Sequence, residues 1–211
     1  ILQKDLNNLS KWSNDWLIKF HPEKCYVMHL GKHNPENDYI MSGHKLRKLE
    51  SERDLGVIVD NNLTFDEHIT EKVSKARQIW GMIRRTFRLI DWNTFPMLFK
   101  AFVRPHLEYA NCIWSPAGKG KIKEIESVQR AATKQIQGLK ELSYPERLRI
   151  LRLPTLKHRR RRGDLIEMYK IMTGVYDQSV VPLIERVPEN NTRLTRGHHY
   201  KVLADYPILL G

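Results

Sequence analysis

Hydrophobic residues between positions 95 and 114 recur at the spacing of an α-helix, and one proline interrupts them. An apolar stripe precedes Pro105 and a second stripe follows it. Because proline lacks a backbone N–H and clashes with the preceding turn, Pro105 should bend or break this helix. Periodicity alone favours a kinked core helix, with the apolar positions Phe95, Leu98, Phe99, Phe102 and Val103 before the proline and Leu107, Tyr109, Ala110, Ile113 and Trp114 after it.

The pattern changes along the rest of the chain. A first helix is predicted over residues 2–20, where apolar residues share one face. Short strands separated by turn residues follow, and from residue 65 onward the pattern is helical. Ser143 and Glu146 have the spacing of a capping box. The predicted strands are 25–30, 38–41, 45–49 and 55–59, and the predicted later helices are 66–89, 93–114, 120–137, 144–152 and 155–173.

These elements predict an α+β fold in which a small antiparallel β patch precedes a mainly α-helical bundle. Three regions result: a β-containing region at 1–64, a helical domain at 65–174 and an irregular C-terminal tail at 175–211. Within the helical domain we expect one core that buries the aromatic side chains Trp80, Phe87, Phe99, Phe102, Tyr109 and Trp114.

Composition narrows the class of protein. The chain has 211 residues, of which 41% are hydrophobic and 28% charged, enough for one moderate core or two small ones. Cys25 and Cys112 offer no disulfide framework and suit a reducing compartment. No apolar stretch is long enough to cross a membrane. We therefore expect an intracellular protein, nuclear and cytoplasmic, without a membrane partner.

Positive charge is concentrated in one segment. The net charge is +12, and residues 115–163 hold 14 Lys and Arg against 4 Asp and Glu. Such a segment attracts phosphate backbones in a salt-dependent way. A solvated basic face, or a nuclear-import patch at 157–162, would give the same composition, so these alternatives stay open.

Helix geometry indicates which basic side chains face outward. On helix 120–137 and the residue before it, Lys119, Lys123, Arg130 and Lys134 lie on a face apart from Ile122, Ile125, Val128, Ala132 and Ile136. On helix 155–173, counting back from Leu165, Met168, Tyr169 and Met172 favours Arg159 and Arg160 as outward and places Arg161 and Arg162 on the packed side. Asp164 lies within pairing reach of Arg160 and Arg161. An ordinary amphipathic helix predicts the same pattern.

Several segments occur in an order and wording typical of one family. They are Trp12-Ser-Asn-Asp-Trp16, the turn at Phe20-His-Pro-Glu-Lys24, the strand Asp54-Leu-Gly-Val-Ile-Val-Asp60, Arg84-Arg-Thr-Phe87, Arg104-Pro105 and Arg162-Gly-Asp164. Together they resemble the C-terminal half of the reverse transcriptase of non-LTR (LINE-type, jockey-like) retrotransposons. The resemblance implies the end of a polymerase palm followed by a thumb over residues 65–174.

The resemblance also implies roles for particular residues. Lys24 matches the lysine of motif D, which would assist pyrophosphate departure in the complete enzyme. Leu55, Gly56 and Val57 match motif E, the primer grip. The basic residues Lys119, Lys123, Arg130, Lys134, Arg159 and Arg160 would contact the template–primer duplex.

The metal-binding aspartates of such polymerases are missing from this sequence. Two magnesium ions, held by carboxylates, drive nucleotidyl transfer in the complete enzyme. The sequence contains neither the aspartate strand nor the Tyr-Ala-Asp-Asp-like hairpin, and His21, Cys25, His29 and His33 lack the spacing of a zinc site. We expect this chain to hold no metal or cofactor, to act on no small-molecule substrate by itself, and to be inactive alone.

The chain begins with Ile1 inside a predicted helix, and we expect it to be a fragment whose partner is the missing N-terminal part of the polymerase. Two alternatives remain open. The chain is a stand-alone basic nucleic-acid-binding protein derived from such an element, or it is a scaffold whose apolar surface seats another protein.

Overall fold

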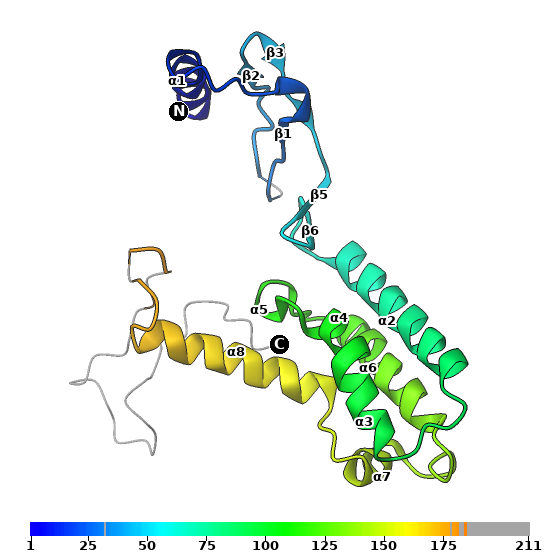
Figure 1. Ribbon diagram of the computed structural model, residues 1–211. Helices are drawn as coiled ribbons and strands as arrows, with labels where there is room; N and C mark the ends of the chain where they lie inside the picture. Colours follow the sequence, from blue (N-terminus) through cyan, green and yellow to red (C-terminus); the bar gives the residue numbers. More distant parts are fainter. Residues whose placement is uncertain (32, 178, 182–183, 185–211) are drawn as a thin grey trace, which may run out of the picture. The chain divides into compact units, whose positions relative to one another are not determined.

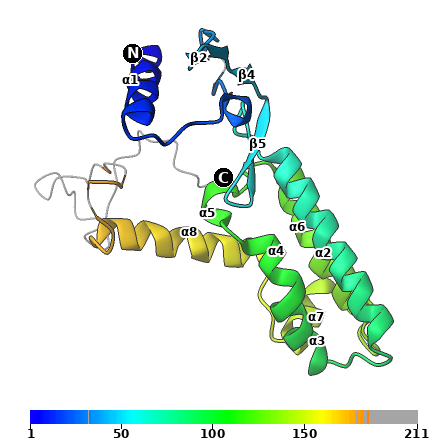
Figure 2. The same cartoon turned by 45° about the horizontal axis from the view of Figure 1, so that its top comes forward.

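The computed structural model describes residues 1–31, 33–177, 179–181 and 184, and it divides the chain into two compact units. The first unit is Ile1–His68 and the second begins at Ile69. Figures 1 and 2 show the helices and strands of each unit. Most of the predicted tail at 175–211 lies outside the described residues. The described residues form an α+β fold, which confirms the predicted class.

The first unit begins with helix α1 (Leu2–Asp15), which ends earlier than the pattern predicted. Leu17 adopts a left-handed conformation with φ 57°. The N–H of Leu17 donates to the carbonyl of Asn14, and the N–H of Ile18 donates to that of Ser13 at 3.0 Å. These two bonds are those of a Schellman motif, which satisfies the last carbonyls of a helix and stops it.

The strands of the first unit form separate two-stranded pairs. Two pairs are antiparallel, as predicted, and the third pair is parallel. A short 3₁₀ helix, η1 (Pro22–Lys24), precedes the first strand. The antiparallel pairs are β2 (Ile40–Met41) with β3 (His44–Lys45) and β5 (Ser51–Asp54) with β6 (Val57–Asp60), and the parallel pair is β1 (Tyr26–Val27) with β4 (Arg47–Lys48).

The hairpin of β5 and β6 corrects one predicted strand. Leu55 and Gly56, which were expected to open a strand at 55–59, form its two-residue turn, with φ of 44° and 84°. Two successive positive φ values are characteristic of the type I′ turn that matches the twist of a β-hairpin. Asp54 therefore pairs with Val57 across the turn.

The second unit is a bundle of helices, whose order follows the predicted one (Figure 1). Its elements are α2 (Asp66–Thr86, which starts in the first unit), α3 (Thr94–Leu98), the π-helical turn η2 (Phe99–Val103), α4 (Arg104–Glu108), α5 (Asn111–Trp114), α6 (Lys119–Lys134), α7 (Tyr144–Ile150) and α8 (Leu156–Met172). The capping box at the start of α7 is present as predicted: the N–H of Ser143 donates to the Glu146 carboxylate at 2.8 Å.

The π-helical turn shifts the buried face of the helix around Pro105. Pro105 has no N–H to donate to the turn before it, and the wider π turn accommodates this loss. A π turn has more residues than an α turn, so the buried positions are spaced by four, at Phe95, Phe99, Val103 and Leu107. Phe102, predicted to be buried, is therefore 55% exposed.

Trp80, Phe99 and Trp114 are buried, as predicted. Besides Phe102, the prediction of burial is wrong for Phe87 and Tyr109. Phe87 is exposed because α2 ends at Thr86. Tyr109 is exposed because the chain leaves the helix there, and Ala110 has φ 52°. The Tyr109 backbone is used internally: its N–H donates to the carbonyl of Pro105 at 3.0 Å, and its carbonyl accepts from the indole N–H of Trp114 at 2.6 Å.

Helices α2 and α6 run side by side and in the same direction. Three polar contacts join them in matching order: Lys121 to Thr70, Arg77 to Ser127, and the Trp80 indole to Gln135 at 2.8 Å. Trp80 also meets the Phe95 ring edge-on at 5.2 Å, which brings α3 into the same core. Helix α8 packs against α5 and α6. This packing fixes which side of α6 remains open to solvent.

Candidate nucleic-acid interface

The open side of α6 carries a stripe of basic side chains. Lys119, Lys123, Arg130 and Lys134 are all exposed, as the helix pattern predicted. At about 100° per residue these four positions fall within an arc of about 60° around the helix axis. We call this set the α6 basic stripe. Its positive charges point away from the bundle, in the direction from which a phosphate backbone can approach.

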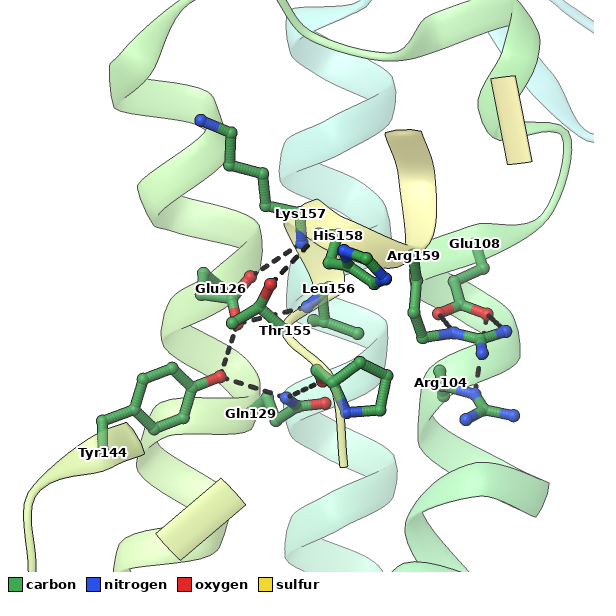
Figure 3. Close-up of polar contacts among 11 residues, drawn as sticks. Arg104, Glu108, Glu126, Gln129, Tyr144, Thr155, Leu156, Lys157, His158 and Arg159 are labelled. Carbon is green, nitrogen blue, oxygen red and sulfur yellow. Dashed lines mark hydrogen bonds and ion pairs between the residues drawn. The ribbon is translucent and has the colours of Figure 1, made fainter. Parts of the chain in front are cut away.

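A buried carboxylate on α6, next to the basic stripe, holds the start of α8. Glu126 accepts hydrogen bonds from the backbone N–H groups of Leu156 at 3.2 Å and Lys157 at 3.0 Å (Figure 3). These are the first two residues of α8, whose N–H groups have no partner within the helix. A negative charge at this position also complements the helix dipole. Glu126 therefore caps α8 from a helix that lies 30 residues earlier.

Tyr144 completes this buried cluster. Its hydroxyl donates to Glu126 and accepts from the side-chain amide of Gln129 at 3.1 Å (Figure 3). Gln129 also donates to the carbonyl of Pro154 at 3.0 Å. Burial, followed by the hydrogen bond to Glu126, raises the pKa of Tyr144 well above that of an exposed tyrosine. The tyrosine is thus a permanent donor that ties α7 to α6.

Arg147 is a basic residue of the charged segment that serves the fold instead of the surface. It is 5% exposed, and its guanidinium donates to the Thr133 hydroxyl and to the carbonyls of Leu142 and Arg130. The guanidinium of Arg130 lies over the Tyr144 ring at 4.6 Å. This cation–π contact orients Arg130 while leaving it exposed.

The four arginines of α8 are arranged differently from the prediction. Arg160 was expected to face outward and is only 3% exposed, whereas Arg161 and Arg162 are exposed instead of packed. The prediction placed the buried stripe on Leu165 and Tyr169, which are both exposed. The side of α8 that faces the bundle follows positions 156, 160, 164, 168 and 172, about a quarter of a turn away.

Arg159 is half-buried and engaged in an ion pair, which also differs from the outward placement predicted for it. Its guanidinium binds both oxygens of Glu108, with Nη2 to Oε2 at 2.9 Å (Figure 3). The hydrogen bond to Glu108 raises the pKa of Arg159 further above its usual range. Arg104 also approaches Glu108, at 3.5 Å. One carboxylate thus serves two arginines and joins α8 to α4.

The residues matched to polymerase motifs lie in the first unit. Lys24 is exposed at the end of η1, and Cys25 separates it from β1. Leu55 and Gly56 form the tip of the β5–β6 hairpin, and Val57, which follows them, is buried. Leu55 is exposed, so the hairpin presents its tip to solvent.

Two classes of site were searched for among the described residues. No group of three or more His, Cys, Asp or Glu is placed so that it could hold a metal ion within that part of the chain. In the same residues, no helix is both long and apolar enough to span a membrane.

Sequence reasoning missed Glu126 and Gln129, the residues that hold α7 and the start of α8 against α6. A signal for them was present, because both lie four residues after apolar positions of α6, Ile122 and Ile125. A carboxylate and an amide on an apolar helix face indicate a buried polar cluster. The residues that Glu126 and Gln129 contact, at 144 and 154–157, are too distant in the sequence to be predicted from the helix pattern.

The chain is similar to polymerases of mobile elements. It is 23% identical over 143 residues to the RNA-directed DNA polymerase from mobile element jockey of Drosophila melanogaster, and 25% identical over 176 residues to the probable RNA-directed DNA polymerase from transposon X-element of the same organism. The alignments cover 65% and 76% of this chain, but only 15% and 19% of those proteins. No protein-family model and no solved structure matches the chain.

A third relative is short. The chain is 24% identical over 143 residues to the uncharacterised protein B0403.1 of Caenorhabditis elegans, and this alignment covers 72% of that protein. Taken together, the similarities indicate an origin related to the reverse transcriptases of non-LTR retrotransposons.

Proposed function

We propose that this chain is the part of a non-LTR retrotransposon reverse transcriptase that follows the catalytic aspartates, and that it positions the template–primer duplex. The similarity to jockey and X-element polymerases supports the origin. The observation that carries the proposed role is the α6 basic stripe, exposed on a helix that Glu126 and Gln129 join to α7 and to the start of α8.

The stripe has a length suited to a nucleic-acid strand. From Lys119 to Lys134 the helix rises about 22 Å, at 1.5 Å per residue. One duplex strand presents a phosphate about every 3.4 Å along the axis, so about six phosphates lie along that length. Contacts to phosphates carry no sequence information, and we expect binding to RNA–DNA or RNA duplexes with little sequence preference.

The first unit has a supporting role in this proposal. Lys24 would stand near the leaving pyrophosphate, and the Leu55–Val57 hairpin tip would approach the primer end, once the missing part of the polymerase supplies the metal-binding aspartates. The isolated chain has neither the aspartates nor the magnesium ions that they hold. We therefore propose binding without catalysis for the chain alone.

Replacing Lys119, Lys123, Arg130 and Lys134 by Gln tests the role of the stripe. Each lost phosphate contact reduces the slope of log affinity against log salt by about 0.9, so the slope should fall by about three to four. A matched control replaces four exposed basic residues elsewhere in the second unit: Arg84, Arg85, Arg88 and Lys100. The control removes the same charge and should leave the slope nearly unchanged.

Two results would contradict the proposal. An unchanged slope in the stripe variant, with a normal melting temperature, would mean that this face is merely solvated. An equal loss in both variants would mean that net charge, and not the stripe, governs binding.

A second candidate function is a stand-alone nucleic-acid-binding protein derived from the same element. The specific observation in its favour is the short Caenorhabditis elegans relative, most of whose length aligns with this chain. The transcript separates the two candidates. A reading frame that continues upstream through the aspartate motifs supports the polymerase part, and a transcript that starts near Ile1 supports the stand-alone protein.

A further inference from the structure

Arg160 is buried without hydrogen-bond partners for the end of its side chain. It is 3% exposed, and neither Nη1 nor Nη2 has a partner among the described residues. These two nitrogens carry four of the five N–H donors of the guanidinium. Leaving buried charged donors unpaired is costly, and buried polar groups in folded proteins are nearly always satisfied. The missing partner is therefore a group that the described residues do not supply.

The neighbouring carboxylates are already engaged. Glu108, Glu126 and Asp164 act on Arg160 through their charge, but each has other partners. Glu108 binds Arg159 and Arg104, Glu126 caps α8, and Asp164 accepts from the Asn111 amide at 3.1 Å.

A small cavity lies beside Arg160. Its volume is about 120 Å³, and it is lined by Glu108, Asn111, Arg159, Arg160, Arg162, Gly163 and Ile166. One water occupies about 30 Å³ in the liquid, so the cavity can accept a group of several atoms. Arg162, one of the lining residues, is exposed, so the cavity reaches the protein surface at this side chain.

The lining is positively charged. Three arginines line the cavity, against the single carboxylate of Glu108 that Arg159 occupies. Arginine side chains present planar sets of N–H donors that match the oxygens of a phosphate. A phosphate group supplies the negative charge and the acceptors that Arg160 lacks.

The absence of a side chain at Gly163 allows α8 to pack closely against Asn111 of α5. A Cβ atom at Gly163 would lie 3.1 Å from the Asn111 amide nitrogen, which is tighter than an ordinary contact. Helices α5 and α8 thus approach each other closely at the cavity.

We propose that the cavity lined by Arg159, Arg160 and Arg162 binds a phosphate group, and that in the nucleic-acid complex it holds one phosphate of the sugar–phosphate backbone. The second part of this inference rests on the proposed function. The first part does not, because a free phosphate ion presents the same oxygens.

Thermal unfolding of the full chain tests the site with inorganic phosphate as the probe, at constant ionic strength. The melting temperature of the wild type should rise in a saturable way as phosphate replaces chloride. Arg160→Met should lose this rise. Arg162→Met should need about tenfold more phosphate for half the effect, since one charge-assisted hydrogen bond is removed.

Arg161→Met is the matched control. It removes the same charge from the adjacent exposed position, which does not line the cavity, and should respond to phosphate as the wild type does. If Arg160→Met fails to fold, the comparison of Arg162→Met with Arg161→Met still decides. No phosphate response in the wild type, or equal responses in these two variants, would overturn the site and leave water as its occupant.

A second arm identifies the source of the phosphate. With the wild type saturated by an RNA–DNA duplex, added phosphate should raise the melting temperature no further, because the backbone occupies the cavity. A phosphate response that persists in the complex would overturn the backbone contact and support a free-phosphate site. A chain that responds to phosphate but binds no duplex would refute the proposed function while the site stands.

Discussion

Replacing Glu126 by alanine should destabilise the second unit strongly, because three donors lose their acceptor at once. These donors are the Tyr144 hydroxyl and the backbone N–H groups of Leu156 and Lys157. Each buried donor left unpaired costs about 1–3 kcal/mol. Leu156 is fully buried, whereas Lys157 is exposed and water can reach its backbone in part. We therefore expect a loss of about 3–5 kcal/mol and a fall in melting temperature of about 10 °C.

Two further variants sharpen this expectation. Glu126→Gln keeps one acceptor oxygen and should cost about half as much. Glu124→Ala on the same helix removes a carboxylate that pairs with Lys121 at 3.2 Å near the surface, and should cost less than about 1 kcal/mol.

Tryptophan fluorescence during urea unfolding measures the effect. Trp80 and Trp114 are buried in the second unit and should dominate the signal, because Trp12, Trp16 and Trp92 are exposed in the folded chain. A Glu126→Ala variant whose free energy of unfolding lies within about 1 kcal/mol of Glu124→Ala would refute the capping role.

Two other outcomes are expected. Supplied with primed RNA, deoxynucleotides and magnesium, the chain alone should incorporate no nucleotide, and extension above a buffer control would show that a metal site was overlooked. Asp60 should titrate below 3.8, because the N–H groups of Thr64 and Phe65 outweigh the effect of burial on its pKa. Its stabilisation is thus fully present above pH 3.8 and lost as the pH falls through the lower folded-state pKa. Asp60→Asn should remove this acid-sensitive part, and an NMR-measured carboxyl pKa at or above 3.8 would contradict the assignment.

Features specified by nearby residues were predictable from the sequence. The capping box at Ser143, the outward face of α6 and the order of the helices all depend on residues within one or two turns of each other. The turn at Leu55 and Gly56 was missed because a hydrophobic residue at positive φ is uncommon in such turns.

Features that depend on distant contacts were not predictable. The π turn before Pro105 changes the helical period from 3.6 to about four, and the sequence gives no direct sign of it. Phe102 consequently moves out of the core. On α8, four successive arginines interrupt the apolar pattern, so the sequence does not show which side of the helix is buried. In the structure that side includes Leu156 and Arg160.

The same contacts reduce the number of basic side chains in residues 115–163 that are free to bind phosphates. Arg147 and Arg160 are buried, and Arg159 is held by Glu108, so these three cations are not available on an open surface. A count of basic residues therefore overstates the number of phosphates that the segment can neutralise. We expect the slope of log affinity against log salt to reflect the exposed cations of this segment, chiefly the α6 basic stripe. Arg160 adds one phosphate contact to that slope only when a phosphate enters its cavity.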